Sequence, residues 1–274
     1  MTETPRSVCV RSGRRTGAWN MAFDQLMMSR IDDGRLDLVL RIFGWSPPCV
    51  SLGKLQRLEE EVDPESVHRM GFHVVRRPTG GRAVLHSSEI TYSLAASRAH
   101  TLVRGSIEES LRRISRAIVE ALEMSGLEVC SGPSPRSSGA RRKPANPCFT
   151  SHAPWEITTP DGRKLVGSAQ ARTSSVFLEH GSIILRNQQP LLADLLPRGV
   201  EEPVRVRVRK TLRRSCGGVL EMDPELDPEV VENNLLRSFQ GALEHALPEV
   251  DVSELEGPEL SELVARNRLA LEDS

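Results

Sequence analysis

The stretch Arg76–His86, which reads RRPTGGRAVLH, lies between two apolar runs, FHVV (72–75) and ITYSLAA (90–96). A plain hairpin turn would need only the two glycines, yet this turn also carries three arginines and ends on a histidine. Glycine lets a backbone N–H approach a ligand closely, and arginine binds phosphate, carboxylate or carbonyl oxygens. The stretch is therefore a candidate ligand-binding turn, and the alternative is a tight turn whose arginines are solvated or ion-paired.

The sequence on both sides of this turn is rich in short β-like runs. Before it, LDLVLRIFGW (36–45) and CVSLGK (49–54) have the composition of strands. After it, KLVGSAQAR (164–172) and VFLEHGSIIL (176–185) are expected to pair as a hairpin. The β-like runs fall into two groups separated by a long helical segment, which favours an α+β fold over a doubly wound parallel sheet.

Three segments have apolar residues at helical spacing. The first is 20–31, with Asn20 as its expected N-cap. The second begins after Ser106, which forms a capping-box pattern with Glu109, and is expected to end at Gly126. The third is 228–247, which predicts a small helical appendage near the C-terminus.

Composition sets limits on the function. The 274 residues include 36 basic and 37 acidic residues, and this balance gives no overall argument for binding nucleic acid or a membrane surface. The N-terminal residues lack the apolar centre of a signal peptide, and no long uninterrupted apolar segment follows. We therefore expect a cytoplasmic protein with no nucleic-acid or membrane partner.

The five cysteines form no CxxC pair, so neither a disulfide framework nor a zinc knuckle is expected. Cys9, Cys49 and Cys130 lie in or beside apolar runs and are expected in the core, whereas Cys216 precedes two glycines in a turn. Cys148 follows a basic segment (131–147) expected to be a loop, and nearby cations lower the pKa of a thiol. Cys148 is a candidate nucleophile, and the alternative is a surface or packing thiol.

Lys164 stands where a turn enters a strand that continues with the small residues Gly167, Ser168 and Ala169. Small side chains in a strand leave room for a ligand, and a lysine at the mouth could reach an acyl carbonyl or a phosphate. The alternative is a solvent-exposed turn lysine. His86 and His180 have a structural role as their default interpretation.

Several motifs in order resemble the superfamily of lipoate-protein ligases, octanoyltransferases and biotin ligases. They are NMAFDQL, WSPPCVSLG, RRPTGGRAVLH, ITYSL, KLVGSAQAR and HGSI, and they span about residues 17–185. The resemblance implies a biotin/lipoyl protein ligase-like α+β domain with a central, mainly antiparallel sheet flanked by helices. It places the catalytic domain at 1–195 and leaves 196–274 as a C-terminal extension packed on it or following it.

The resemblance also assigns roles to residues. The turn would bind the polar head of a lipoyl or octanoyl group, and the wall of the cleft would continue along the strand after Lys164. Lys164 would contact the acyl carbonyl, and Cys148 resembles the catalytic cysteine of the octanoyltransferases. The substrate-binding residues implied in this way are Arg76, Arg77, Gly80, Gly81, His86, Gly167, Ser168 and Ala169; no metal site is implied.

The implied activity is transfer of an octanoyl group from acyl carrier protein to a lysine of a lipoyl domain, such as the glycine-cleavage H protein. The acyl group would pass through a thioester on Cys148, and no cofactor would be needed. One alternative is a lipoate-protein ligase, which would require ATP and magnesium. The others are an amidotransferase acting between lipoyl domains and a catalytically silent module that binds lipoyl domains or lipoate.

Two basic segments have no place in this assignment. Arg136, Arg141, Arg142 and Lys143 could steer an acidic carrier protein toward the enzyme, and the alternative is a solvated loop. VRVRVRK (204–210) alternates like an edge strand with a cationic face, or it could be a contact surface for a partner.

Overall fold

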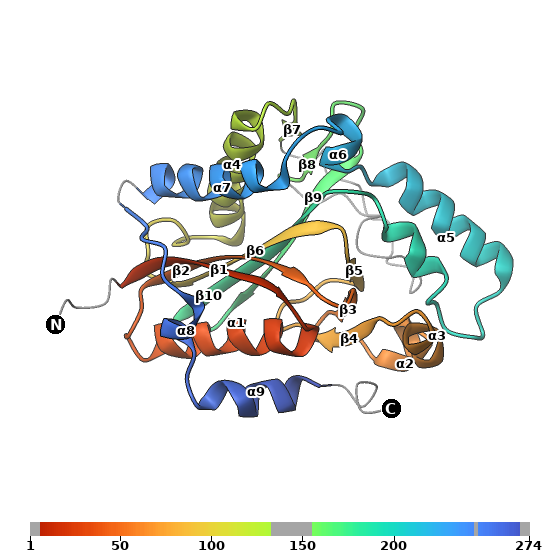
Figure 1. Cartoon of the computed structure of the whole chain (residues 1–274), viewed down its shortest axis with the longest axis horizontal. Helices are drawn as coiled ribbons and strands as arrows, with labels where there is room; N and C mark the ends of the chain where they lie inside the picture. The colour runs from red at the N-terminus through yellow and green to blue at the C-terminus, as the bar shows by residue number, and fades with distance from the viewer. Residues whose placement is uncertain (1–5, 133–154, 244–245, 269–274) are drawn as a thin grey trace.

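A seven-stranded sheet lies at the centre of the molecule, in the order β1-β2-β6-β10-β9-β8-β7 (Figure 1). The computed structural model describes residues 6–132, 155–243 and 246–268. Only β1 and β2 pair in parallel, and every other neighbouring pair of this sheet is antiparallel, as the sequence predicted. The strands are β1 (Ser7–Arg15), β2 (Leu38–Trp45), β6 (Glu89–Ser97), β7 (Cys130–Ser131), β8 (Ile157–Thr158), β9 (Lys164–Arg172) and β10 (Val176–Ile184).

Both faces of this sheet are covered by helices, and β6 shows how its sequence permits this. Ile90, Tyr92 and Leu94 pack in one apolar cluster with α4 (Ile107–Met124) and α7 (Pro228–Leu243). Ala95 points to the opposite face and packs in a cluster with α1 (Gly17–Asp32). This alternation follows from the two-residue period of a strand, and it places α4 and α7 on one face and α1 on the other.

Helix α1 begins three residues earlier than expected. Thr16 is the N-cap, and its side chain accepts a hydrogen bond from the Trp19 N–H. Asn20, the expected cap, lies inside the helix, where its side-chain amide donates to the carbonyls of Arg15 and Gly44. The helix is buried on both sides because α9 (Glu259–Asn267) packs on its outer surface, so its sequence lacks a polar face to mark the start.

The two other predicted helices are confirmed. In α4 the Ser106 side chain accepts from the Glu109 N–H and the Glu109 carboxylate accepts from the Ser106 N–H, which is the predicted capping box. Gly126 adopts a φ of +83° just after the helix, which suits glycine at a helix end. Asp227 caps the first turn of α7 through the Glu229 N–H.

A second, three-stranded sheet lies beside the main one and carries the binding-turn sequence. It has the order β4-β3-β5, formed by β4 (His73–Arg76), β3 (Cys49–Leu52) and β5 (Val84–His86). Its apolar cluster also includes η2 (Gln189–Ala193) and α5 (Glu202–Ser215). The short helices α2 (Leu58–Glu61), α3 (Pro64–Arg69), α6 (Val219–Met222) and α8 (Val252–Leu255) complete the described elements.

The segment VRVRVRK is part of helix α5, so the edge-strand interpretation is wrong. Val204, Val208 and Leu212 recur every four residues and pack against the small-sheet cluster, while Pro203 stands in the first helical turn. Alternation of valine and arginine over a few residues fits a strand and a helix alike, and the apolar contacts at every fourth residue decide between them.

The other sequence-based expectations had mixed outcomes. Cys9 and Cys49 are buried as expected, and so is Cys216, but Cys130 is exposed because β7 is a short edge strand. The expected C-terminal helices are present: α7 packs on α4, and α9 packs on α1. The boundary at residue 195 stays a prediction. Within the described part of the chain, no helix is long and apolar enough to cross a membrane.

Gly181 gives a test of the packing around the sheet centre. A Cβ at this position would lie 2.6 Å from the Tyr92 ring, so Gly181→Ala is expected to lower the free energy of unfolding by about 1–3 kcal/mol. In the exposed part of α7, Gly241→Ala meets nothing within 4 Å and is expected to raise it by up to about 1 kcal/mol. Urea denaturation of both variants checks the pair, and equal effects would contradict the packing argument.

Candidate active site

A cavity opens where strands β9 and β10 of the main sheet face the small sheet. Its empty volume is about 470 Å³, including the open solvent at its mouth. One part of the wall is apolar and consists of Met21, Phe43, Trp45 and Val84. The remaining lining residues are Ser51, Arg77, His86, Thr91, Gly167, Ser168, Ala169, His180, Gly181 and Ser182. The cavity thus combines an apolar end with a polar wall.

Arg77 holds the binding turn together. Its side chain is buried, and its guanidinium donates to the carbonyls of Ser51, Gly80 and Arg82 at 2.7–2.8 Å. It also donates to the Ser51 hydroxyl at 2.9 Å. These bonds tie the turn to itself and to β3. Arg77 therefore shapes the cavity wall from within as well as lining it.

The other turn residues lie differently from one another. Arg76 does not line the cavity, and its guanidinium donates to the carbonyl of Gln56. Gly81 has a φ of +95°, a conformation that favours glycine. A Cβ at Gly53 would collide with the Gly81 carbonyl, so the glycine at the end of β3 lets the turn pack closely. Gly80 is exposed, and nothing lies within 4 Å of a Cβ placed there.

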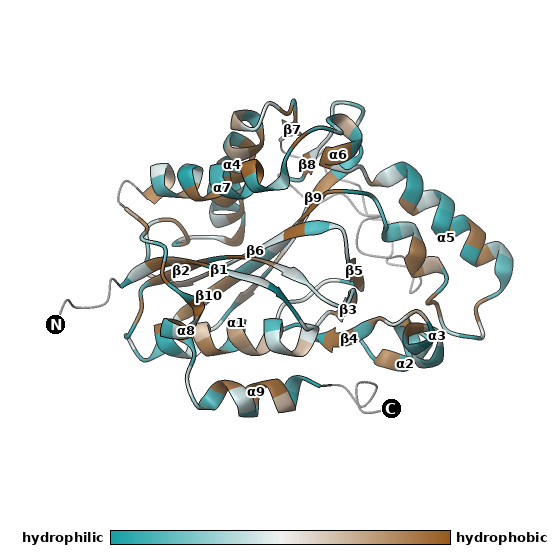
Figure 2. Cartoon of the chain, in the orientation of Figure 1, coloured by the Kyte–Doolittle hydropathy of each residue, from teal (hydrophilic) through white to brown (hydrophobic). Residues whose placement is uncertain are grey.

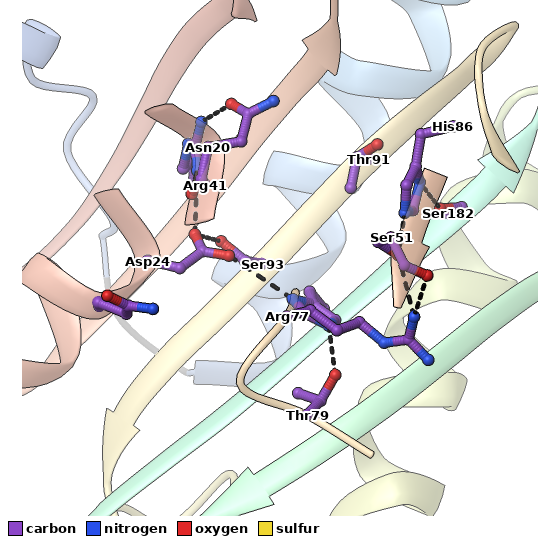
Figure 3. A network of polar contacts seen from close by, with 12 residues as sticks. Asn20, Asp24, Arg41, Ser51, Arg77, Thr79, His86, Thr91, Ser93 and Ser182 are labelled. Carbon is purple, nitrogen blue, oxygen red and sulfur yellow. Dashed lines mark hydrogen bonds and ion pairs between the residues drawn. The ribbon is translucent and has the colours of Figure 1, made fainter. Parts of the chain in front are cut away.

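His86 is fixed by contacts on both ring nitrogens (Figure 3). Nδ1 lies 2.7 Å from the Glu89 carboxylate, and Nε2 lies 2.7 Å from the Ser51 hydroxyl. Since a carboxylate only accepts, the proton is on Nδ1, and Nε2 can accept from Ser51. The Trp45 ring stacks on the imidazole at a centroid distance of 4.1 Å. His86 is therefore held rigidly at the cavity wall.

His180 connects the binding turn to the other side of the site. Its Nε2 lies 2.6 Å from the Thr79 hydroxyl, and its Nδ1 lies 3.6 Å from the Asp24 carboxylate. Burial lowers the pKa of His180, although the neighbouring Asp24 opposes this effect. The imidazole is therefore neutral at physiological pH, and it bridges α1 and the turn by polar contacts.

Asp24 and Arg41 form a buried ion pair with 3.0 Å between Nη1 and Oδ1, and each side chain is 1% exposed. Burial acts to raise the pKa of Asp24, but the contacts with His180 and Arg41 outweigh it and leave that pKa below its ordinary value. Burial lowers the pKa of Arg41 to about 10, so the guanidinium remains charged at neutral pH. Ser93 also donates to Asp24 at 2.8 Å.

Lys164 lies beside a second cavity, on the α4 side of strand β9. Its Nζ is 2.5 Å from the Glu156 carboxylate, and both side chains are largely buried. This cavity has an empty volume of about 770 Å³, including open solvent, and it shares Ser168 and Ala169 with the first one. Two cavities, one apolar-ended and one holding a buried ammonium group, therefore meet at the small residues of β9.

The structure brings together five of the predicted binding residues in the first cavity: Arg77, His86, Gly167, Ser168 and Ala169. Lys164 borders the adjoining cavity, whereas Arg76, Gly80 and Gly81 do not line the first one. Cys148 lies outside the described residues. Within the described ranges, no group of three His, Cys, Asp or Glu side chains could hold a metal ion.

Sequence reasoning did not assign several residues that organise the site. These are Asp24, Arg41, Ser51, Thr79, Glu89 and His180. Glu89 carried a weak signal, because it follows His86 by three residues. Asp24 and Arg41 carried none, because their partners come from different elements and only the fold brings them together.

Asp24→Asn is expected to destabilise the protein by about 3–5 kcal/mol, because it leaves the buried Arg41 guanidinium without a compensating charge. Asp33→Asn removes an exposed ion pair with Arg35 and is expected to cost less than about 1 kcal/mol. Urea denaturation at neutral pH compares the two variants. A similar small effect for both would show that Arg41 does not depend on Asp24.

Glu179 predicts a pH-dependent stability. It is buried beside Tyr92 and Gln170, and burial raises its pKa to about 7 from an ordinary value of 4.5. Between these values the folded state holds a proton that the unfolded chain releases, so this group lowers the free energy of unfolding as pH rises. The loss totals roughly 3 kcal/mol and levels off above pH 7.

Glu179→Gln removes this titration. The stability of the variant relative to the wild type is therefore expected to increase from pH 4.5 to 7 in urea denaturation. Glu128→Gln, at an exposed position, is the control. A difference between Glu179→Gln and wild type that stays constant over this pH range would contradict the raised pKa.

Comparisons with known proteins identify the family. Residues 16–240 match the Lipoyl protein ligase A/B catalytic domain. The chain is 40% identical over 225 residues to octanoyltransferase LipM of Moorella thermoacetica, with 80% of each chain covered. It is 36% identical over 261 residues to octanoyltransferase LipM of Kyrpidia tusciae, with 94% of each covered. For octanoyltransferase LipM of Bacillus subtilis the identity is 32% over 242 residues, covering 87% of this chain and 85% of the relative.

Solved structures agree with the fold. A bipartite lipoate protein ligase from Thermoplasma acidophilum superimposes with a TM-score of 0.72 at 21% identity, covering 96% of this chain and 91% of that one. Lipoate-protein ligase A bound with ATP gives a TM-score of 0.70 at 20% identity, covering 96% and 93%. These similarities confirm the expected ligase-like fold, and the sequence matches confirm the expected family. The chain belongs to the lipoyl protein ligase A/B catalytic domain family.

Proposed function

We propose that this chain is an octanoyltransferase that moves an octanoyl group from acyl carrier protein to a lysine of a lipoyl domain, through a thioester on Cys148. The relatives named octanoyltransferase LipM, three of which are 32–40% identical over most of the chain, support the activity. The structural observation that carries the proposal is the meeting of the apolar-ended cavity and the Lys164 cavity at Ser168 and Ala169.

This arrangement suits an acyl group. The hydrocarbon tail would lie against Met21, Phe43 and Trp45, where burial of apolar surface gives the binding energy. The carbonyl would then lie near Ser168, with the Lys164 ammonium on the other side of the strand. An ammonium group there would stabilise both a cysteine thiolate and the oxyanion formed at the carbonyl.

The proposed reaction has two acyl transfers. The Cys148 thiolate attacks the carbonyl carbon of the donor thioester, the bond from that carbon to the carrier sulfur breaks, and the carrier thiol takes up a proton. The amine of the acceptor lysine then attacks the Cys148 thioester and forms an amide. The Cys148 thiolate leaves, and it is the group to which we assign the proton lost by the amine.

No nucleotide or metal is needed in this scheme. The donor and the acyl-enzyme are both thioesters of similar group-transfer potential, and the final amide is more stable than either. The rigid wall around His86 and Arg77 would position the carbonyl during both steps. The expected cytoplasmic location stays a prediction.

Intact-protein mass spectrometry tests the proposal. Wild-type protein mixed with octanoyl-carrier protein and no ATP is expected to gain one octanoyl group that neutral hydroxylamine removes. Cys148→Ser is expected to gain none, because the nucleophile is absent. Cys130→Ser, which changes an exposed cysteine on β7, is expected to behave like the wild type.

Other results would replace the proposal. Product that forms only with ATP and free lipoate, in wild type and Cys148→Ser alike, would indicate a lipoate ligase. Acyl transfer only from an octanoylated lipoyl domain would indicate an amidotransferase. Absence of turnover with every donor would indicate a binding module.

A further inference from the structure

Helix α5 carries six cationic side chains, and the fold uses two of them. Arg205 donates to the carbonyls of Ala193, Leu196, Pro197 and Val200, which fastens the helix to the segment before it. Arg209 pairs with the Asp194 carboxylate at 2.5 Å. These two arginines therefore have a structural role.

The other four cations, Arg207, Lys210, Arg213 and Arg214, are exposed. Over residues 6–132, 155–243 and 246–268, none of them forms an ion pair with a carboxylate. By contrast, the exposed Arg6, Arg35 and Arg198 all have acidic partners. Figure 2 shows hydrophilic ribbon along most of α5, interrupted by apolar positions. We call these four residues the basic face of α5.

The basic face is adjacent to the candidate active site. Cys216, directly after the helix, pairs with Lys164 in an isolated β-bridge, and the Gly217 N–H donates to the Lys164 carbonyl at 3.0 Å. The buried side of α5 packs in the same apolar cluster as Val84, which lines the acyl cavity. The helix therefore begins away from the site and ends at the candidate catalytic lysine.

The local charge contrasts with the whole chain, whose net charge is -1. Residues 133–154, the sequence that contains Cys148, add Arg136, Arg141, Arg142 and Lys143 and have no aspartate or glutamate. Positive charge is thus concentrated in two segments, one joined to Lys164 in space and one holding Cys148 in sequence. Such a concentration favours encounter with an acidic partner.

We propose that the basic face of α5 is the docking surface for the acidic carrier protein that donates the acyl group. This inference rests on the proposed octanoyl transfer. Arg207, Lys210 and Arg214 are spaced three and four residues apart, so they lie on one side of the helix and can meet one acidic surface together.

The distance from the site favours the donor over the acceptor. At 1.5 Å per residue, Lys210 and Arg207 stand roughly 9–14 Å along the helix from the contact with Lys164. A carrier protein presents its thioester on a long prosthetic arm, so it can dock at such a distance while the carbonyl reaches the cavity. An acceptor offers only a lysine side chain, and therefore has to lie directly over the cavity.

The test compares two donors, octanoyl-carrier protein and octanoyl-pantetheine, with the double variant Arg207→Glu/Lys210→Glu. With the carrier protein, kcat/KM is expected to fall at least about tenfold, mainly through KM, because the charges that attract the acidic surface are reversed. With octanoyl-pantetheine, which lacks the protein, kcat/KM is expected to change less than about twofold. The KM for the lipoyl domain is expected to stay the same.

Controls separate docking from folding. Arg116→Glu/Arg237→Glu reverses two exposed cations on α4 and α7 and is expected to leave both donors unaffected. Arg207→Gln/Lys210→Gln, which only neutralises charge, is expected to give a smaller loss with the carrier protein alone. Added salt is expected to weaken carrier-protein turnover of the wild type more than that of the Glu variant.

Three outcomes would overturn the proposal. An equal loss with both donors would place the effect in the active site. A selective rise in the KM for the lipoyl domain would assign the basic face to the acceptor. A wild type that uses neither donor would reject the octanoyl transfer itself, which distinguishes that failure from a failure of docking alone.

Discussion

The buried ion pair between Arg41 and Asp24 is the interaction on which the site depends. Arg41 lies inside the main sheet and donates to Ser12, Asn20 and Asp24, which come from β1 and α1. Its guanidinium also stacks over the Phe43 ring at 3.8 Å. Removing two charges from water is costly, and a buried pair is tolerated when further hydrogen bonds satisfy both partners. The result is a fixed anion beneath the acyl cavity, and His180 rests against it.

Two polar arms extend from the sheets to the binding turn. One runs from Asp24 through His180 to Thr79, and the other runs from Glu89 through His86 and Ser51 to Arg77. Thr79 and Arg77 belong to the same turn, so the turn is held from both sides. A wall built in this way needs little reorganisation when a ligand binds, which is the condition for effective stabilisation of charge during a reaction.

Strand β9 separates the two parts of the proposed chemistry. The apolar-ended cavity lies on one face and Lys164 on the other, and the small residues 167–169 allow the two to meet. Beyond Val166, β9 has no further pairing with β8, so this part of the strand stays accessible on that side within the described residues. Helix α5 ends at the start of the same strand, and a partner docked on its basic face would deliver a thioester to that meeting point.

The sequence by itself determined the family, the mainly antiparallel sheet, helices α4 and α7, and most of the first cavity's predicted wall, because local spacing and ordered motifs encode these features. It did not determine the start of α1, where a helix buried on both sides has no polar face to mark its end. It also left VRVRVRK open, since alternation fits both a strand and a helix until the partners of Val208 and Leu212 are known. Only the tertiary structure showed that Arg77 braces its own turn and that Asp24, Arg41 and His180 support it. Those contacts join residues far apart in the chain, and no local pattern records such pairs.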